Sequence, residues 1–132
     1  ARRRRAVVFR ADRPACIQAP CIASPGIAMD IHRAAHVLGR NRHAGVERCL
    51  FRNHEEGGRT SVVRLQAGSL FPRHRHEAGE DVLVIAGRVV IGGAELAPGD
   101  YLYAAPGEEH DVQALTDAVT FVSSPRPTPL LA

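Results

Sequence analysis

Residues 68–87 read GSLFPRHRHEAGEDVLVIAG. His74 and His76 are two residues apart, so on a β-strand both side chains point to the same face. Glu80 follows after a short glycine-containing turn and opens an apolar run over residues 82–85. The stretch therefore predicts two neighbouring strands that bring two imidazoles and a carboxylate together.

A third histidine at strand-like spacing is His110, thirty residues after Glu80 in the segment PGEEH. Three imidazoles and one carboxylate form a ligand set for a divalent transition metal, and Fe, Mn, Ni, Co and Zn are all compatible with it. No thiolate lies at ligand spacing, which excludes a cysteine-rich structural zinc site. The sequence predicts one metal ion per chain, bound by His74, His76, Glu80 and His110.

The spacing of these residues resembles the first sequence motif of the cupin superfamily, G-x5-H-x-H-x(3,4)-E-x6-G. Every fixed position of that motif is filled, by Gly68, His74, His76, Glu80 and Gly87.

The second cupin motif, G-x5-P-x-G-x2-H-x3-N, is matched in part, by Gly99, Gly107 and His110. Its proline is displaced by one position to Pro106, and Ala114 stands in place of the final asparagine. That asparagine is not a metal ligand in the family, so its loss leaves the implied ligand set intact.

The resemblance implies an all-β fold, a small cupin barrel (double-stranded β-helix or jelly roll, RmlC-like). A single domain is expected over residues 29–132, with its core at about 45–125. Short apolar stretches punctuated by Gly and Pro also favour a sandwich or barrel. The expected strands cover 47–52, 60–65, 70–76, 81–86, 89–91, 95–96, 101–103, 110–115 and 119–123. The proline-rich tail over residues 125–129 is expected to be a loose end.

Residues 1–28 differ from the rest in composition. They hold six Arg and one Asp (+5), whereas residues 29–132 hold eleven Arg and thirteen acids (−2), which gives the net charge of +3. We interpret 1–28 as a flexible, poorly structured leader that precedes a natural start at Met29; the alternatives are a genuine flexible arm and an arm that pairs with a second subunit. Four arginines without a motif are typical of a solvated tail, so no nucleic-acid partner is expected. No apolar run reaches the length of a membrane span.

A chain shortened to begin at Met29 is therefore expected to fold and to bind metal as the full chain does. Thermal unfolding and metal content of the shortened protein check this expectation. Insolubility or loss of metal would show that residues 1–28 are part of the structure.

The three cysteines, Cys16, Cys21 and Cys49, are odd in number and lack C-x2-C spacing. This pattern argues against a disulfide framework and favours a reducing, cytoplasmic compartment. Cys49 is interpreted as a small buried hydrophobe.

Four other histidines lie outside the motifs. His32 and His36 stand at i, i+4, a spacing that can bind metal on a helical turn, but no third ligand lies near them. His43 and His54 lie in polar, loop-like segments. We interpret all four as solvated or capping side chains.

Strand alternation predicts the surroundings of the metal. The apolar residues expected to share the inner face with the ligands are Leu70, Pro72, Val82, Val84, Val112 and Ala114. The candidates for polar contacts in the pocket are Arg64, Gln113, Tyr101 and Tyr103. An apolar pocket with one charged centre suits a small, largely uncharged ligand or dioxygen. No catalytic residue is assigned.

The resemblance leaves three functional classes open. The first is a metal-dependent enzyme of dioxygenase or isomerase type, in which open coordination positions let the metal act as a Lewis acid. The second is a non-catalytic metal- or oxidant-sensing or ligand-binding module, similar to the cupin half of certain anti-sigma regulators. The third is a metal-free sugar-modifying cupin; such proteins pair a His base with Lys or Tyr, and the absence of lysine counts against it.

Two further expectations concern pH and assembly. Metal retention should fall as pH drops toward the ordinary histidine pKa of about 6.5. Leu83 and Ile85 should point away from the metal, and related small cupins commonly cover that face by pairing two barrels, so a twofold homodimer is expected. The alternative is that residues 29–45 cover the face within the chain.

Overall fold

The computed structural model describes residues 29, 31–33 and 39–131. The expected leader over 1–28 lies outside these residues, as does the helical turn that would contain His36. All strands belong to the unit Val37–Ala132. No helix long and apolar enough to cross a membrane occurs in the described part of the chain.

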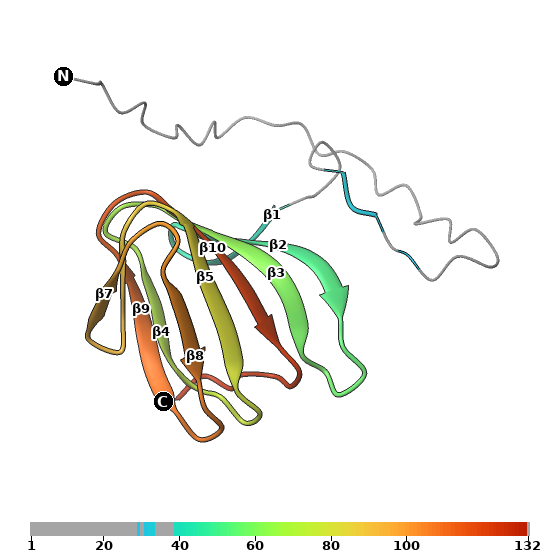
Figure 1. Cartoon of the computed structure of the whole chain (residues 1–132). Helices are drawn as coiled ribbons and strands as arrows, with labels where there is room; N and C mark the ends of the chain where they lie inside the picture. The colour runs from blue at the N-terminus through green and yellow to red at the C-terminus, as the bar shows by residue number, and fades with distance from the viewer. Residues whose placement is uncertain (1–28, 30, 34–38, 132) are drawn as a thin grey trace. The chain divides into compact units, whose positions relative to one another are not determined.

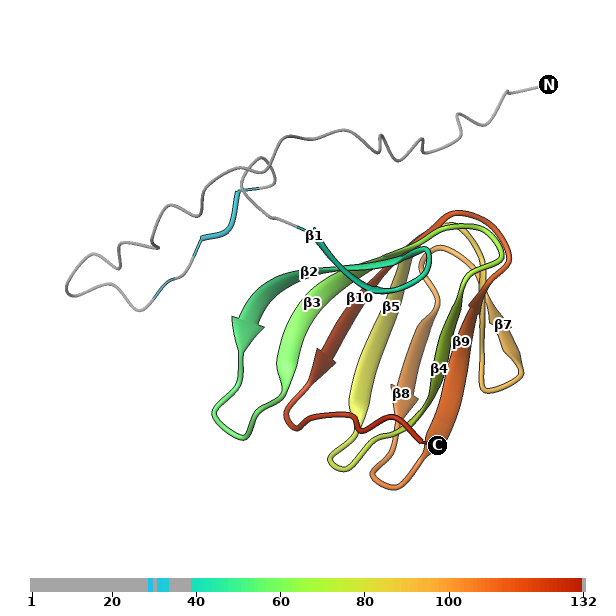
Figure 2. The ribbon, with the colours of Figure 1, turned by 180° about the vertical axis from the view of Figure 1, so that it is seen from behind.

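Ten strands make up the described fold: β1 (Gly39–His43), β2 (Val46–Asn53), β3 (Arg59–Leu65), β4 (Leu70–Arg75), β5 (Glu80–Ala86), β6 (Val89–Ile91), β7 (Ala94–Leu96), β8 (Tyr101–Ala104), β9 (Glu109–Ala114) and β10 (Ala118–Ser124). They form a six-stranded sheet, in the order β1-β2-β3-β10-β5-β8, and a four-stranded sheet, in the order β4-β9-β6-β7. All pairings are antiparallel. The two sheets face each other, as Figures 1 and 2 show, and the all-β jelly-roll prediction is confirmed.

The nine expected strands are all present, with ends within one residue of the expected positions. β1 was not expected, because its sequence GRNRH has no apolar alternation. It forms through main-chain pairing with β2, in which Gly39 lies opposite Cys49. His43 therefore ends a strand rather than lying in a loop, whereas His54 lies in the turn after β2 and contacts Thr60 (Nε2 to Oγ1, 2.8 Å).

The core lies between the sheets and consists of aliphatic side chains, chiefly valine. β5 shows the alternation that builds it: Glu80, Val82 and Val84 are buried, whereas Leu83 and Ile85 are exposed. Ala114 on β9 is also buried, as expected from the position of His110. Cys49 is buried too, as predicted.

Strand β4 departs from simple alternation. Its register with β9 shifts between Phe71 and His74, which marks a bulge at Pro72 and Arg73. Proline lacks the N–H that a regular ladder needs, so a break at Pro72 is favoured. As a result Phe71, not Leu70, packs against the core beside His74, and Leu70 is exposed. The expectation that Leu70 faces inward is wrong for this reason.

The C-terminal tail is not a loose end. The main chain of residues 129–131 lies along the edge of β4, where Arg75 N–H donates to the Pro129 carbonyl (3.1 Å) and Leu131 N–H donates to the Arg73 carbonyl (2.9 Å). Proline cannot donate but its carbonyl still accepts, so the prolines of the tail are compatible with this edge. The segment fixes Thr128 and Leu130 against the large cavity described below.

Candidate metal centre

The four predicted ligands come from both sheets, on or next to strands β4, β5 and β9. His74 on β4 and His110 on β9 lie directly opposite each other in the small sheet. His76 follows the end of β4, where its N–H donates to the Glu108 carbonyl at 2.9 Å. Glu80 is the first residue of β5, in the other sheet. The centre therefore lies between the two sheets.

The structure brings these side chains together in a compact, buried group. One donor atom from each of His74, His76, Glu80 and His110 lies within 4.8 Å of the others. His76 Nε2 lies 3.0 Å from His110 Nε2 and 3.7 Å from a carboxyl oxygen of Glu80. Donor atoms that bind one metal ion with bonds of about 2.0–2.2 Å lie at separations from one another that are similar to these two donor–donor distances. The donor set therefore fits a divalent transition metal.

Hydrogen bonds decide which ring nitrogen of His74 can coordinate. Its Nδ1 lies 2.8 Å from the Pro72 carbonyl oxygen, which can only accept, so Nδ1 carries the proton and Nε2 keeps its lone pair. His76 Nε2 and His110 Nε2 lie 3.0 Å apart, so in the metal-free protein the ring N–H of one histidine can donate a hydrogen bond to the other, and a metal ion bound by both would take the place of that proton. The buried Nδ1 of His76 has no hydrogen-bond partner among the described residues.

Burial controls the charge of the group. Desolvation raises the pKa of Glu80 to about 8, although the nearby Arg48 guanidinium opposes the shift. Desolvation, followed by the neighbouring histidines, lowers the pKa of His76 to about 4, and burial lowers the pKa of His110 to about 4 as well. The imidazoles are therefore neutral at pH 7, which is the form that coordinates a metal.

Glu109 lies next to His110 in sequence but does not orient it. Its carboxylate forms ion pairs with Arg73 (3.3 Å) and Arg75 (2.9 Å) on the outer surface of β4. Those arginines lower the pKa of Glu109.

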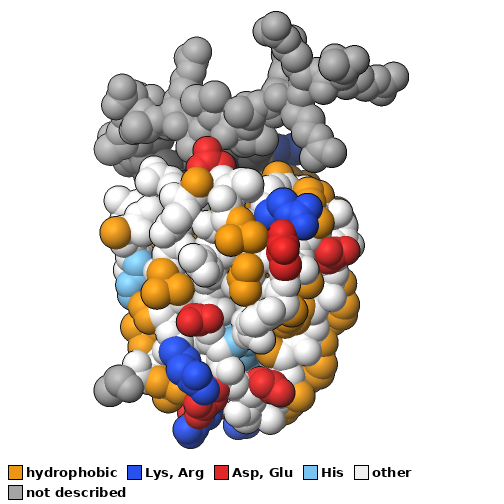
Figure 3. All heavy atoms as spheres, turned by 90° about the vertical axis from the view of Figure 1, so that its left-hand side faces the viewer, with side chains coloured by type: hydrophobic (Ala, Val, Ile, Leu, Met, Phe, Trp, Pro, Cys, Tyr) orange, Lys and Arg blue, Asp and Glu red, His pale blue; other side chains and the backbone are white. Residues whose placement is uncertain are grey.

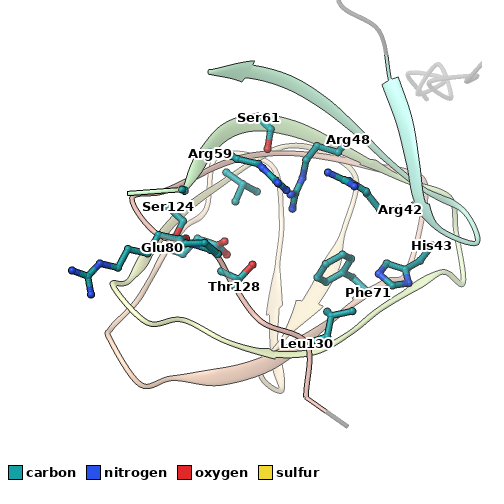
Figure 4. Close-up of a pocket in the computed structure, with 15 residues that line it drawn as sticks. Arg42, His43, Arg48, Arg59, Ser61, Phe71, Glu80, Ser124, Thr128 and Leu130 are labelled. Atoms are coloured by element: carbon teal, nitrogen blue, oxygen red, sulfur yellow. The ribbon is translucent and has the colours of Figure 1, made fainter. Parts of the chain in front are cut away.

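Two cavities adjoin the centre, and Glu80 and Arg48 line both of them. The smaller one, about 40 Å³, is lined mostly by apolar side chains, which include Val82 and Val112, and also by the ligand His74. The larger one, about 350 Å³, is lined by polar as well as apolar groups (Figure 4). The expectation of an apolar pocket with a single charged centre is wrong for the larger cavity, because arginines from β1, β2 and β3 line it.

Several predicted pocket residues do not line these cavities. Arg64 forms an ion pair with Glu47 (3.0 Å), and Val84 is part of the core. Tyr101 donates a hydrogen bond to Asp81. The residues that are exposed instead of lining the cavities are Leu70, Gln113, Tyr101 and Tyr103.

Sequence reasoning missed the arginines and Phe71. Arg48 stands two residues after the buried Val46 in β2, so strand alternation could have placed it on the inner face. Arg42 gave no such signal, because β1 has no apolar alternation.

The chain belongs to the cupin superfamily, as its match to a cupin family model over residues 26–127 shows, and its two facing antiparallel sheets and cluster of histidines and glutamate agree with this. Residues 26–127 match the ChrR cupin-like domain family, and the chain is a member of that family.

The proteins that are similar to this chain have names from different functional classes. A DNA damage-repair/toleration protein of Arabidopsis thaliana, DRT102, is 34% identical over 70 residues, which cover 48% of this chain and 23% of that protein. The fold is similar to that of a putative acetylacetone dioxygenase from Methylibium petroleiphilum (TM-score 0.74, 17% identity, 84% of this chain and 86% of the other). It is also similar to the fold of a chain in the complex of Rhodobacter sphaeroides SigE with the anti-sigma ChrR (TM-score 0.62, 21% identity, 70% of this chain and 51% of the other).

Proposed function

We propose that this domain binds one divalent transition metal ion (Fe, Mn, Ni, Co or Zn) through His74, His76, Glu80 and His110, and that it is an enzyme of dioxygenase or isomerase type acting on a small molecule. The observation that carries this proposal is the continuity between the ligand cluster and a cavity. Glu80 belongs to the cluster and also lines the 350 Å³ cavity. A ligand in that cavity would lie next to the metal.

The bound ion would supply Lewis acidity, which polarises a substrate oxygen or lowers the pKa of bound water. The chain's own residues prepare the site for this role. The Pro72 carbonyl fixes the orientation of His74, and burial between the sheets desolvates the carboxyl of Glu80. The carboxyl of Glu80, whose pKa is raised by burial, would lose its proton when the ion binds.

Elemental analysis of protein purified without added metal tests the proposal, followed by an oxygen-uptake screen under Fe(II). The screen should use 1,3-diketones and small organic acids. Bound iron with substrate-dependent uptake is the result expected of a dioxygenase, and isomerisation without uptake is expected of an isomerase. A protein that binds metal but turns over none of these compounds would count against an enzyme.

A second candidate function is a metal- or oxidant-sensing module. The family match favours a sensing module, because the matched family is the ChrR cupin-like domain and the structural relatives include ChrR in complex with SigE. For this function, bound zinc without turnover is expected. A change in protease sensitivity or assembly on oxidation would support a sensor, and an unchanged protein would oppose it.

We also propose a twofold dimer. Leu83 and Ile85 on β5 are exposed, at 39% and 50%, and β1, the described strand of the 29–45 segment, lies at the other edge of the same sheet. Tyr101 and Tyr103 on the neighbouring β8 are exposed as well. By contrast, the face seen in Figure 3 mixes hydrophobic side chains with charged ones.

Light scattering is expected to give about twice the 14.2 kDa chain mass at micromolar concentration. Ile85→Glu should yield the single-chain mass, because it would place a carboxylate in the apolar contact. A single-chain mass for the unaltered protein would contradict the dimer.

A cytoplasmic location is likewise a proposal, and its support is the free, buried thiol of Cys49.

A further inference from the structure

Three arginines from different strands converge on the larger cavity. Arg42 lies on β1, Arg48 on β2 and Arg59 at the start of β3, and Figure 4 shows their side chains extending toward the same space. None of the three forms an ion pair with the described residues, in contrast to five arginines that pair with carboxylates at 2.7–3.3 Å: Arg64, Arg73, Arg75, Arg88 and Arg126.

Arg48 is the most enclosed of the three. Its Nε is buried and has no hydrogen-bond partner among the described residues. Burial lowers the pKa of Arg48, and the like charges of Arg42 and Arg59 lower it further. Guanidinium groups remain charged in proteins, so this arrangement is costly unless an anion joins it.

The charges that line the cavity do not cancel. Four arginines and one carboxyl, that of Glu80, line it, and His43 is the other titratable side chain among the lining residues. Arg126 is compensated by an ion pair with Glu56 at 2.8 Å. The other three arginines face only Glu80, whose carboxylate would be bound to the metal. A cavity with this excess of positive charge attracts anions.

We propose that the cavity binds a small organic acid, whose carboxylate is held by Arg42, Arg48 and Arg59 and whose remaining atoms reach toward Glu80 and the metal. The planar, multi-donor guanidinium matches a carboxylate in a bidentate manner. Phe71, Val122 and Leu130 provide apolar walls for the carbon skeleton. As an assignment of substrate class, the inference rests on the proposed metal-dependent function; as an anion site, it rests on the arginines alone.

Isothermal titration of the protein as isolated tests the inference with three probes: succinate, inorganic phosphate and the neutral succinamide. Succinate is expected to bind, and succinamide is expected not to bind. Arg48→Gln should weaken succinate binding at least tenfold. Arg88→Gln is the matched control, because Arg88 pairs with Glu95 and does not line the cavity, and its affinity should equal that of the unaltered protein.

Arg42→Gln and Arg59→Gln keep the test decisive if Arg48→Gln does not fold, because these two arginines are exposed as well as lining the cavity. Each should weaken succinate binding. Equal binding of succinate and succinamide, or an affinity unchanged in all three variants, would overturn the anion site. Binding of phosphate without succinate would overturn the assignment to an organic acid.

The metal proposal can fail separately. His76→Ala removes a metal ligand but none of the residues that line the larger cavity. Succinate binding that survives in His76→Ala and depends on Arg48 upholds the anion site, whatever the metal content of the unaltered protein. Absence of succinate binding in a protein that contains one metal ion per chain overturns the anion site and leaves the metal centre standing.

Discussion

Replacing His76 with alanine is expected to lower metal affinity by more than roughly 100-fold, since changes to residues that merely orient a ligand already cost about 10–100-fold. His76 is fully buried, and its Nε2 lies at 3.0 Å from His110 and 3.7 Å from Glu80, so no other side chain can take its place without rearrangement. Metal content after dialysis and the dissociation constant from a competitive chelator measure the effect.

His54→Ala is the matched control, because it removes an imidazole that contacts Thr60 and is not part of the ligand group. Its metal content should equal that of the unaltered protein. Thermal unfolding shows whether His76→Ala is folded: metal should raise the unfolding temperature of the unaltered protein and of His54→Ala but not of His76→Ala. Full metal occupancy in folded His76→Ala would exclude the proposed ligand set.

The second large effect expected is the dependence of metal binding on pH. Because burial raises the pKa of Glu80 to about 8, the metal-free carboxyl is protonated at neutral pH and must lose its proton when the metal binds. Affinity should rise about tenfold per pH unit up to pH ~8 and then level off. Calorimetry in buffers of different ionisation enthalpy should show the release of about one proton per ion at pH 6–7.

The histidines should contribute only at much lower pH. The pKa values of His76 and His110 are lowered to about 4, so the expected loss of metal as pH falls toward 6.5 is assigned to Glu80 rather than to the histidines. Glu80→Gln removes the titrating group and should abolish the proton release at pH 6–7. Two or more protons released per ion in that range would contradict the assignment of the effect to Glu80.

The same shift has a consequence for the metal-free protein. Between the ordinary carboxyl pKa and about 8, the folded chain holds a proton on Glu80 that the unfolded chain has released. The folded state binds more protons, so the free energy of unfolding should fall as pH rises from 6.5 to 8. Bound metal, which replaces that proton, should remove the dependence.

The strands and the ligand group could be predicted from the sequence because both depend on local spacing. The alternation of Glu80, Val82 and Val84 fixes the inner face of β5 without knowledge of its partners. His74 and His76 lie on one face of their segment for the same reason, and the motif spacing added His110. Prediction was weaker where main-chain pairing decides the structure, as in β1, whose polar sequence pairs with β2.

The anion site depends on features that local spacing does not contain. Arg42, Arg48 and Arg59 come from three strands, and only the order β1-β2-β3 brings them to one cavity. The bulge at Pro72 reverses which face Phe71 occupies, so counting back from His74 selected the wrong neighbour. Tail residues such as Leu130 reach the cavity through pairing with β4, whereas the prolines of the tail had led us to expect no strand pairing there.

The most direct test of the metal centre is the anomalous scattering of crystals grown from metal-loaded protein. One peak per chain is expected, at about 2.0–2.3 Å from His74 Nε2, His76 Nε2, His110 Nε2 and a carboxyl oxygen of Glu80. A peak at any other group of side chains, or none at these four in protein whose metal content is one ion per chain, would contradict the account.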